Sequence, residues 1–499
     1  MPLRFDNGYA RLPERFYARQ QPQTMPALRL VLFNEALGRE LGFDAAADAQ
    51  QQLASLLSGR MEGAEPLAMV YAGHQFGNWV PRLGDGRALL LGEVVTAAGE
   101  HLDIHLKGSG RTPFSRGGDG RAVLGPVLRE FIVSEAMARL GIPTTRALAA
   151  LTTGDEVMRE EPLPGALMVR VARSHVRVGT FQYFMAMGDH DGLRQLADFV
   201  IDRLYPQART APQPYRAFLD AVIEAQARLV AEWMGVGFIH GVMNTDNTSI
   251  AGETIDYGPC AFMDTFDPAT VFSSIDVYGR YAYGNQPDIL YWNLARLAQA
   301  LMPLLAEDPA EARAFSSEAG TASLEEKRKI SSREAQTAVD RFPALYEAAW
   351  LAVMRRKLGL LSEQAGDMAM IMDFYRIMRE MQADHTLGFR ALASSLEEAT
   401  DALAEPAFAP WLERWRARLK QDWTDNSAPA KHLNSVNPLY IPRNHLVEEA
   451  LAAAYAGDYG PAKTLHGVLA EPFTEQKGRE RYAQPPRPEQ VVQQTFCGT

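Results

Sequence analysis

The sequence predicts an α+β fold with two lobes, a small amino-terminal lobe built on an antiparallel sheet and a large, mainly helical carboxyl-terminal lobe. Before about residue 172, short runs alternate apolar and polar residues, which is typical of half-buried strands. Beyond residue 180 the apolar residues recur at helical spacing to about residue 404. The 499 residues are 47% hydrophobic, which allows a large core and two or three closely packed lobes.

Composition and charge exclude several classes of function. The 50 Lys and Arg residues against 61 Asp and Glu residues give a net charge of −11, which argues against nucleic acid or an anionic membrane as a partner. No apolar run reaches the length of a transmembrane helix, and the first residues lack the apolar segment of a signal peptide. Two cysteines, Cys260 and Cys497, are too few for a disulfide framework. We expect a cytoplasmic, monomeric enzyme.

The first part of the chain contains the predicted hairpin of the small lobe. An amphipathic helix is expected over residues 28–41, ahead of the sheet. Residues 88–95 and 101–107 are expected to pair as strands, because two apolar runs flank a turn at residues 97–100. Apolar and polar residues alternate in the second strand, so Lys107 lies on the face opposite the apolar one.

Two glycine-rich segments, 73–87 and 108–121, each end in the sequence Gly-Asp-Gly-Arg. Such loops beside a strand can cover phosphate groups, so the repeat predicts a shared ligand. A helix is expected over residues 126–140, and Glu130 lies beside its apolar stripe, free to face Lys107. Glycine loop, strand, Lys, helix and Glu occur in this order in the amino-terminal lobe of kinases, where the Lys–Glu ion pair aims the ammonium at phosphates.

The remaining segments are expected to complete both lobes. Strands are predicted at 145–152 and 165–171, and the second leads into the basic cluster Arg170, Arg173 and Arg177. Helices are predicted over most of 180–235 and over 292–305, on either side of an irregular segment at 259–287. We expect linkers or surface loops at 306–335 and 421–438, and an extended tail after residue 474.

The loop that begins at His240 carries the strongest chemical signal. It reads His-Gly-Val-Met-Asn-Thr-Asp-Asn, and Asp256-Tyr-Gly follows nine residues after Asn247. Kinases have His-Arg-Asp or His-Gly-Asp, then four residues, then Asn, with Asp-Phe-Gly later in the chain. The Asn247 amide and the Asp256 carboxylate are hard oxygen ligands suited to Mg²⁺ on ATP phosphates. Val242 occupies the position of the kinase's proton-accepting Asp.

Each of these residues also has a simpler structural explanation. Arg170 and Arg177 are equally consistent with surface charges at a strand end and with phosphate contacts. Asp246 can cap a turn or supply the base that is missing at Val242, and its position next to a metal-binding Asn favours the base. His74, His105 and His240 are expected to be structural, the last by orienting loop backbone. The order of the motifs along the chain is what makes their combination specific.

At these residues the chain closely resembles the selenoprotein O family, also called SelO or YdiU. The resemblance covers essentially the whole chain and rests on long uninterrupted matches. These are YAGHQFG at 71–77, LGDGRA at 83–88, DIHLKGSG at 103–110, SRGGDGRAVL at 115–124, GIPTTRAL at 141–148, HGVMNTDN at 240–247, IDYGPCAFMD at 255–264 and NPLYIPRN at 437–444.

The resemblance implies a protein-kinase-like bilobal fold with an αC-type helix in the small lobe and family-specific extensions. It implies transfer of AMP from ATP to Ser, Thr or Tyr hydroxyls of proteins, with release of pyrophosphate and with Mg²⁺ or Mn²⁺. ATP would bind flipped relative to a kinase, so that its α-phosphate faces the acceptor. The expected segments are a packing arm at 1–70, a lobe with nucleotide-binding loops at 71–178, a helical lobe with the catalytic loop at 179–420, and an extension with a redox tail at 421–499.

The resemblance also implies a role for each matched residue. Asp246 would be the proton acceptor, Glu130 would pair with Lys107, and Asn247 and Asp256 would hold the metal. The family's selenocysteine lies near the carboxyl end, so Cys497 could form a redox pair with Cys260. The residues expected on the nucleotide are Gly84, Gly86, Arg87, Lys107, Asp119, Gly120, Arg170, Arg177 and Asp256.

Two other functions remain open on the residues alone. An atypical kinase could use Asp246 in place of the lost base and transfer the γ-phosphate of ATP. A pseudokinase could bind the nucleotide as a scaffold, which the valine at position 242 would explain. The intact Lys107, Asn247 and Asp256 argue against a scaffold, because binding alone would not need all three.

Overall fold

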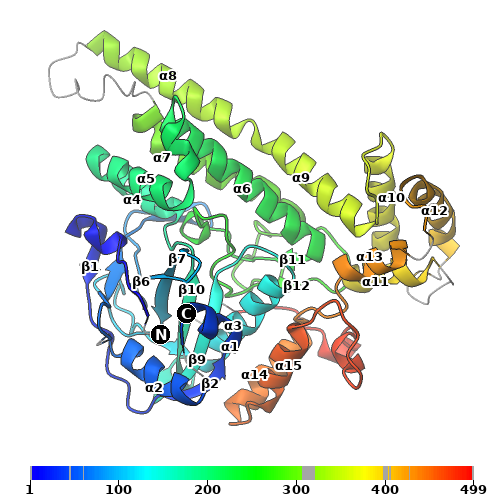
Figure 1. Cartoon of the computed structure of the whole chain (residues 1–499), viewed down its shortest axis with the longest axis horizontal. Coiled ribbons are helices and arrows are strands. Elements are labelled where there is room, and N and C mark those ends of the chain that lie inside the picture. The colour runs from blue at the N-terminus through cyan, green and yellow to red at the C-terminus, as the bar shows by residue number, and fades with distance from the viewer. Residues whose placement is uncertain are drawn as a thin grey trace.

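The computed structural model describes residues 3–43, 46–59, 61–305, 321–396, 403, 406–425 and 428–496. An antiparallel sheet with short helices around it forms one part of the molecule, and long helices extend from it to a group of shorter helices at the other end (Figure 1). The fold is therefore α+β. None of the helices within the described ranges is long and apolar enough to cross a membrane.

The sheet has the strand order β1-β3-β6-β7-β10-β9-β2, with β8 paired to β10, and its pairs are antiparallel. The expected strands at 88–95, 101–107, 145–152 and 165–171 are confirmed, although the last two are longer than predicted. The strands are β1 Tyr17–Arg19, β2 Arg29–Phe33, β3 Leu67–Met69, β6 Ala88–Val95, β7 His101–Lys107, β8 Ala122–Val123, β9 Arg146–Met158 and β10 Pro162–Ala172.

The helix expected over residues 28–41 is wrong in its first half. Residues Arg29–Phe33 form the edge strand β2, and only Glu35–Leu41 form a helix, α1. The side chain of Asn34 accepts a hydrogen bond from the backbone of Leu37, which caps the helix at that point. The leucines are spaced as in a helix over all of residues 28–41. Residues 29–33, before the Asn34 cap, are nevertheless a strand because they pair with β9.

The two faces of the sheet are covered by different elements. One face packs on α1 and on α2 (Ala46–Leu57), with inward side chains that include Ile104, Leu106 and Val169. The other face packs on α3 (Leu124–Arg139), which is close to the helix predicted at 126–140 and lies beside α14 (Asn444–Tyr455) and α15 (Gly460–Leu469). Polar side chains of β7 point toward this second face, because successive strand residues alternate.

The long helices confirm the mainly helical character of the rest of the chain (Figure 1). α6 packs on α7 and α9, and α7 packs on α8. The helices are α4 Val178–Ala186, α5 His190–Leu204, α6 Pro214–Val236, α7 Gln286–Leu305, α8 Thr321–Val339, α9 Phe342–Lys357, α10 Asp367–Glu380, α11 His385–Ser394, α12 Ala409–Asp422 and α13 Ala428–Val436.

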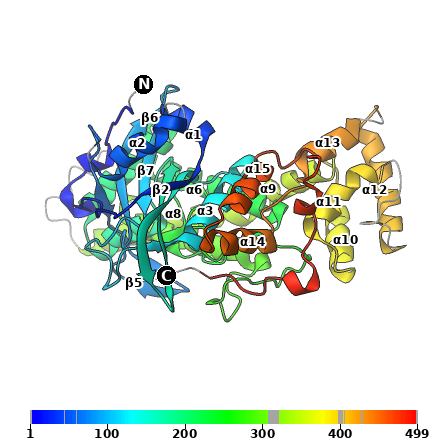
Figure 2. The same cartoon turned by 90° about the horizontal axis from the view of Figure 1, so that it is seen from below.

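Two segments expected as linkers contain helices instead. Helix α8 covers residues 321–335 of the first, whose residues 306–320 lie outside the described part, and α13 covers much of the second. In α13 only Pro429 and Leu433 are buried, so few apolar positions mark it as a helix in the sequence. In its described part, the tail after residue 474 contains no α-helix or named strand, in line with the expectation of an extended tail. It has short 3-10 turns and a bridge between Thr495 and Ser273, and it runs back past α14 toward the sheet (Figure 2).

Candidate active site

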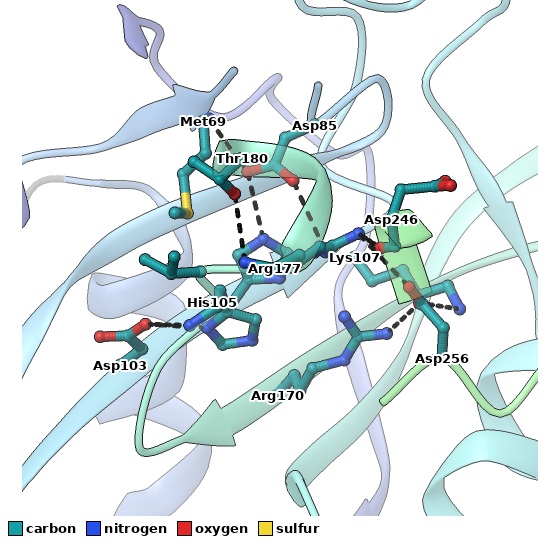
Figure 3. Close-up of polar contacts among 12 residues, drawn as sticks. Met69, Asp85, Asp103, His105, Lys107, Arg170, Arg177, Thr180, Asp246 and Asp256 are labelled. Carbon is teal, nitrogen blue, oxygen red and sulfur yellow. Dashed lines mark hydrogen bonds and ion pairs between the residues drawn. The ribbon is translucent and has the colours of Figure 1, made fainter. Parts of the chain in front are cut away.

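Strands β7 and β10 place two cations on the same face of the sheet. They pair antiparallel so that Lys107 lies opposite Met168, and Arg170 lies opposite His105. Directly opposed residues point to the same side, so Lys107 and Arg170 both face α3, on the side away from the apolar face. Figure 3 shows these side chains converging with Arg177, which is the residue before α4, on Asp256.

Glu130 of α3 joins the two strand cations. Its carboxylate is fully buried and accepts hydrogen bonds from the Lys107 ammonium and from Nε of Arg170, the latter at 2.9 Å. Burial alone would raise the pKa of Glu130, but Arg170 and Lys107 lower it below its usual value. The carboxylate is therefore ionised, and it holds both cations in place.

Asp256 lies at the centre of a cationic cluster. Its carboxylate is 2.8 Å from the Arg170 guanidinium, 3.5 Å from Arg177 and 3.9 Å from the Lys107 ammonium. Burial would raise the pKa of Asp256, but these three cations lower it well below its usual value. Its backbone has a φ of +63°, a conformation uncommon for residues other than glycine and concentrated at functional sites.

The loop at 240–247 is held against the Asp256 segment by His240. Its Nε2 donates to the carbonyl oxygen of Ile255 at 2.9 Å, and its Nδ1 accepts from the backbone N–H of Val242 at 3.3 Å. The expectation that His240 orients loop backbone is confirmed. Asn247 donates its side-chain N–H to the Val242 carbonyl oxygen at 3.0 Å, which leaves its amide oxygen as the atom available to a ligand.

Asn247 and Asp256 fit a hard divalent cation as a partial set of ligands. An amide oxygen and a carboxylate are ligands that Mg²⁺ accepts, and Mg²⁺ usually completes its shell with phosphate oxygens and water. Within the described residues, no group of three or more His, Cys, Asp and Glu side chains is placed to hold a metal ion. A metal at this place would complete its shell with water and with phosphate oxygens of a bound nucleotide.

Asp246 is buried in the same loop. Its Oδ2 accepts a hydrogen bond from Gln75 at 3.2 Å, and its Oδ1 has no hydrogen-bond partner among the described residues. Burial raises the pKa of Asp246 to about 6. The Gln75 side chain belongs to β4 (Gly73–Gln75), whose hairpin with β5 (Asn78–Val80) covers the loop.

The two glycine-rich segments pack against each other, as a shared ligand requires. The hydroxyl of Thr112 donates to the Asp85 carbonyl oxygen at 2.6 Å, and Ser115 donates to that of Gly86. A side chain at Gly84 would meet the Phe114 ring at 2.5 Å, and one at Gly120 would come within 2.1 Å of the Gly110 carbonyl oxygen. These glycines allow the close approach of the loops.

The other residues expected on the nucleotide have structural partners. Gly86 allows close approach to the Phe114 backbone. The carbonyl oxygen of Arg87 accepts from the Gly108 N–H at 2.7 Å. The carboxylate of Asp119 accepts from Arg159 at 2.7 Å.

Several buried polar residues near the cations were not expected from the sequence. The ring of Tyr71 lies 4.5 Å from the Arg177 guanidinium carbon, Asp85 lies beside Arg177, and His105 stacks on His175. His105 and Lys107 alternate with apolar residues in β7, so the sequence could have indicated a polar face on this strand. That this face is buried could not be predicted locally, because Glu130 of α3 covers Lys107 and His175 covers His105.

The structure describes one cysteine of the possible redox pair. Cys260 is fully buried, and burial raises the pKa of its thiol to about 12. Cys497 lies outside the described residues. The tail comes close to the first cysteine nevertheless, because the Thr495 hydroxyl donates to the Pro259 carbonyl oxygen at 2.6 Å.

Comparison with known proteins assigns the chain to a family. A family model described as protein adenylyltransferase SelO matches residues 1–470. Proteins named protein nucleotidyltransferase YdiU are similar over nearly the whole chain. The one from Rhizobium rhizogenes is 53% identical over 100% of this chain and 97% of its own length. The one from Cereibacter sphaeroides is 53% identical over 100% of both chains.

These matches cover the sheet, the loop at 240–247 and the buried cations alike, and they agree with the resemblance noted in the motifs. The chain therefore belongs to the SelO family of protein adenylyltransferases.

Proposed function

We propose that this protein transfers AMP from ATP to Ser, Thr or Tyr hydroxyls of other proteins, with Mg²⁺ or Mn²⁺, and releases pyrophosphate. The observation that carries the proposal is the convergence of Lys107, Arg170 and Arg177 on one ionised carboxylate, Asp256, beside a buried acid with a free oxygen. Lys107, Arg170 and Arg177 are all buried and lie together, so the cluster is suited to dispersing the charge of a polyphosphate.

The proposed nucleotide site uses the two packed glycine loops as its cover. Gly84, Gly86, Arg87, Asp119 and Gly120 would lie over the nucleotide. Lys107, Arg170 and Arg177 would disperse the negative charge that develops on the departing pyrophosphate. A metal bound by Asn247 and Asp256 would add positive charge at the phosphates.

Asp246 is the proposed base. Its pKa of about 6 leaves it mostly ionised at neutral pH, and its Oδ1 is free of other hydrogen bonds among the described residues. In the proposed step, a carboxylate oxygen of Asp246 accepts the proton of the substrate hydroxyl, and the hydroxyl oxygen bonds to the α-phosphorus. The bond from that phosphorus to the bridging oxygen breaks, and pyrophosphate leaves with the electron pair.

The order of elements supports a kinase-like bilobal arrangement. Strand β7 with its lysine, helix α3 with its glutamate, and the loops at 240–247 and 256–258 follow one another as in kinases. The segments proposed above, 1–70, 71–178, 179–420 and 421–499, then correspond to the arm, the two lobes and the extension. Residues 1–70 also supply β1, β2 and β3 to the sheet.

Labelled ATP tests the reaction directly. The protein is incubated with an unfolded, hydroxyl-rich acceptor such as β-casein and with ATP carrying ³²P at either the α- or the γ-phosphate. Label from the α-position on protein, with none from the γ-position, is the expected result. Label from the γ-position would establish the atypical kinase, and ATP binding without transfer or turnover would establish the scaffold.

A further inference from the structure

The guanidinium of Arg177 is enclosed by four groups from different parts of the chain. It stacks on Tyr71 with 4.5 Å between the guanidinium carbon and the ring centre, and it donates to the Asp246 carbonyl oxygen at 3.0 Å. Its other neighbours are Asp256 at 3.5 Å and Asp85 at 3.9 Å, while its Nε is buried without a partner among the described residues. Arg177 is thus surrounded but not saturated with hydrogen bonds.

Asp85 is itself fixed by contacts on one of its two oxygens. The Oδ2 atom accepts from the Met69 backbone N–H at 3.0 Å and lies 3.4 Å from Nε2 of His105. The Oδ1 atom is left facing Arg177 (Figure 3). The carboxylate is almost completely buried, and it belongs to the glycine loop between Gly84 and Gly86.

A row of buried polar groups begins at His105, the neighbour of Asp85, and leads away from Arg177. His105 stacks on His175 with 4.1 Å between ring centres, and Nδ1 of His175 lies 3.0 Å from Asp103. Burial lowers the pKa of His175 to about 3, so this imidazole is neutral. The Asp103 carboxylate also accepts from Arg203 at 2.6 Å, which ties the row to α5.

Asp85 is ionised in this environment. Burial alone would raise its pKa, but His105, Arg177 and the Met69 N–H lower it below its usual value. An ionised carboxylate at 3.9 Å attracts the guanidinium without forming the short paired bond that would occupy its donors.

We propose that Asp85 is a positioning residue that orients Arg177 toward the phosphates and couples that orientation to the glycine loop at 84–87. The inference rests on the proposed nucleotide site. Asp85 is anchored to Met69 and His105 of the sheet, so it holds the guanidinium at a fixed place beside the glycine loop that would cover the nucleotide. Tyr71 supports the same orientation by stacking on the guanidinium.

A double-mutant cycle between Asp85→Asn and Arg177→Lys tests the coupling. Asparagine keeps the shape and an acceptor for the Met69 N–H but removes the charge. We expect Asp85→Asn to lower kcat/KM for ATP about tenfold, mainly through a higher KM. In the Arg177→Lys background the same change should cost less than about twofold, because the group that Asp85 orients is already altered.

Asp103→Asn is the matched control, since it makes the same change in the same buried row without touching Arg177. It can lower the fraction of active enzyme, but KM for ATP should stay that of the wild type. If Asp85→Asn is too unstable to purify, Asp85→Ser, which is also uncharged and smaller, is put through the same cycle and should show the same dependence on Arg177. If the fold-losses in kcat/KM of the two single variants multiply in the double variant, the inference is wrong. An Arg177→Lys single variant with normal kinetics would instead refute the proposed nucleotide site.

Discussion

The guanidinium of Arg170 lies 2.8 Å from the carboxylate of Asp256, the residue proposed to bind a metal. Arg170 also holds Glu130, so it links the metal loop to α3 and, through Glu130, to Lys107. A cation entering this site meets a carboxylate that is already neutralised by arginine. A metal bound by Asp256 would compete with Arg170 for this carboxylate, and a guanidinium released from it would be available to a phosphate oxygen.

Asp256→Asn should separate nucleotide binding from the effect of the metal. We expect transfer to fall at least about a hundredfold, because a ligand of the metal is lost. Calorimetric titration with ATP should show tighter binding with Mg²⁺ than with EDTA in the wild type and no difference in the variant. A variant that still responds to Mg²⁺ would show that the metal is bound elsewhere.

Lys107→Ala should abolish transfer and leave the protein folded. Glu130 loses the ammonium in this variant but keeps Arg170, so its charge remains paired. Glu130→Gln is the contrasting change, because it leaves Lys107 and Arg170 with Asp256 as their remaining acid in the cluster. Loss of one partner from a buried ionic group costs about 3–5 kcal/mol, so Glu130→Gln should have the lower Tm. A lower Tm for Lys107→Ala would contradict the assigned pairing.

The pH dependence should report on Asp246. A base must be ionised, so kcat/KM should rise as pH increases through about 6, the pKa of this acid. In Asp246→Asn this limb should disappear and kcat should fall, while the Kd for ATP stays near that of the wild type. An equal loss of ATP affinity would indicate a binding role.

The raised pKa of Asp246 also has a consequence for stability. The folded state holds a proton that the unfolded state loses above its ordinary pKa of 3.8, so this group's contribution to stability falls as pH rises from 3.8 to about 6. Above that range a buried carboxylate remains ionised at a cost. Asp246→Asn should therefore unfold at the same or a higher Tm than the wild type at pH 7, as measured by calorimetry.

Gly73→Ala should impair turnover by displacing the base. A methyl group at this position would lie 2.5 Å from Oδ1 of Asp246, too close for any side chain. Gly467→Ala is the control, since nothing lies within 4 Å of its added methyl group and it sits in α15. The control should keep full activity and gain up to about 1 kcal/mol of stability from helix propensity. Normal turnover in Gly73→Ala would mean that the hairpin does not hold Asp246.

A reversible disulfide between Cys260 and Cys497 remains a prediction. Oxidised glutathione would accept the two electrons and the two thiol protons and leave as two molecules of reduced glutathione, while the high pKa of Cys260 makes the reaction slow. We expect transfer to depend on reductant in the wild type and not in Cys497→Ser, because the bond would restrain the segment after Asp256. Equal rates throughout, with two free thiols counted under oxidising conditions, would show that the pair has no regulatory role.

The sequence by itself determined the local elements of the site. Alternation in β7 placed Lys107 on the polar face, the apolar stripe of α3 placed Glu130 beside it, and the motifs at 240–247 and 256–258 indicated the chemistry. These features depend on residues that are neighbours along the chain. Local spacing is therefore sufficient to predict them.

Only the tertiary structure decided how these elements meet. Asn34 caps a helix that is shorter than predicted, and the residues before it pair with β9 as a strand, although the spacing of the leucines favours a helix there. Asp85 lies in a glycine-rich turn of the sequence, yet its carboxylate is 3.9 Å from Arg177, which directly precedes α4, and it is held there by Met69 and His105. Contacts between residues so far apart in the chain depend on how the layers pack, and no periodicity in the sequence encodes that packing.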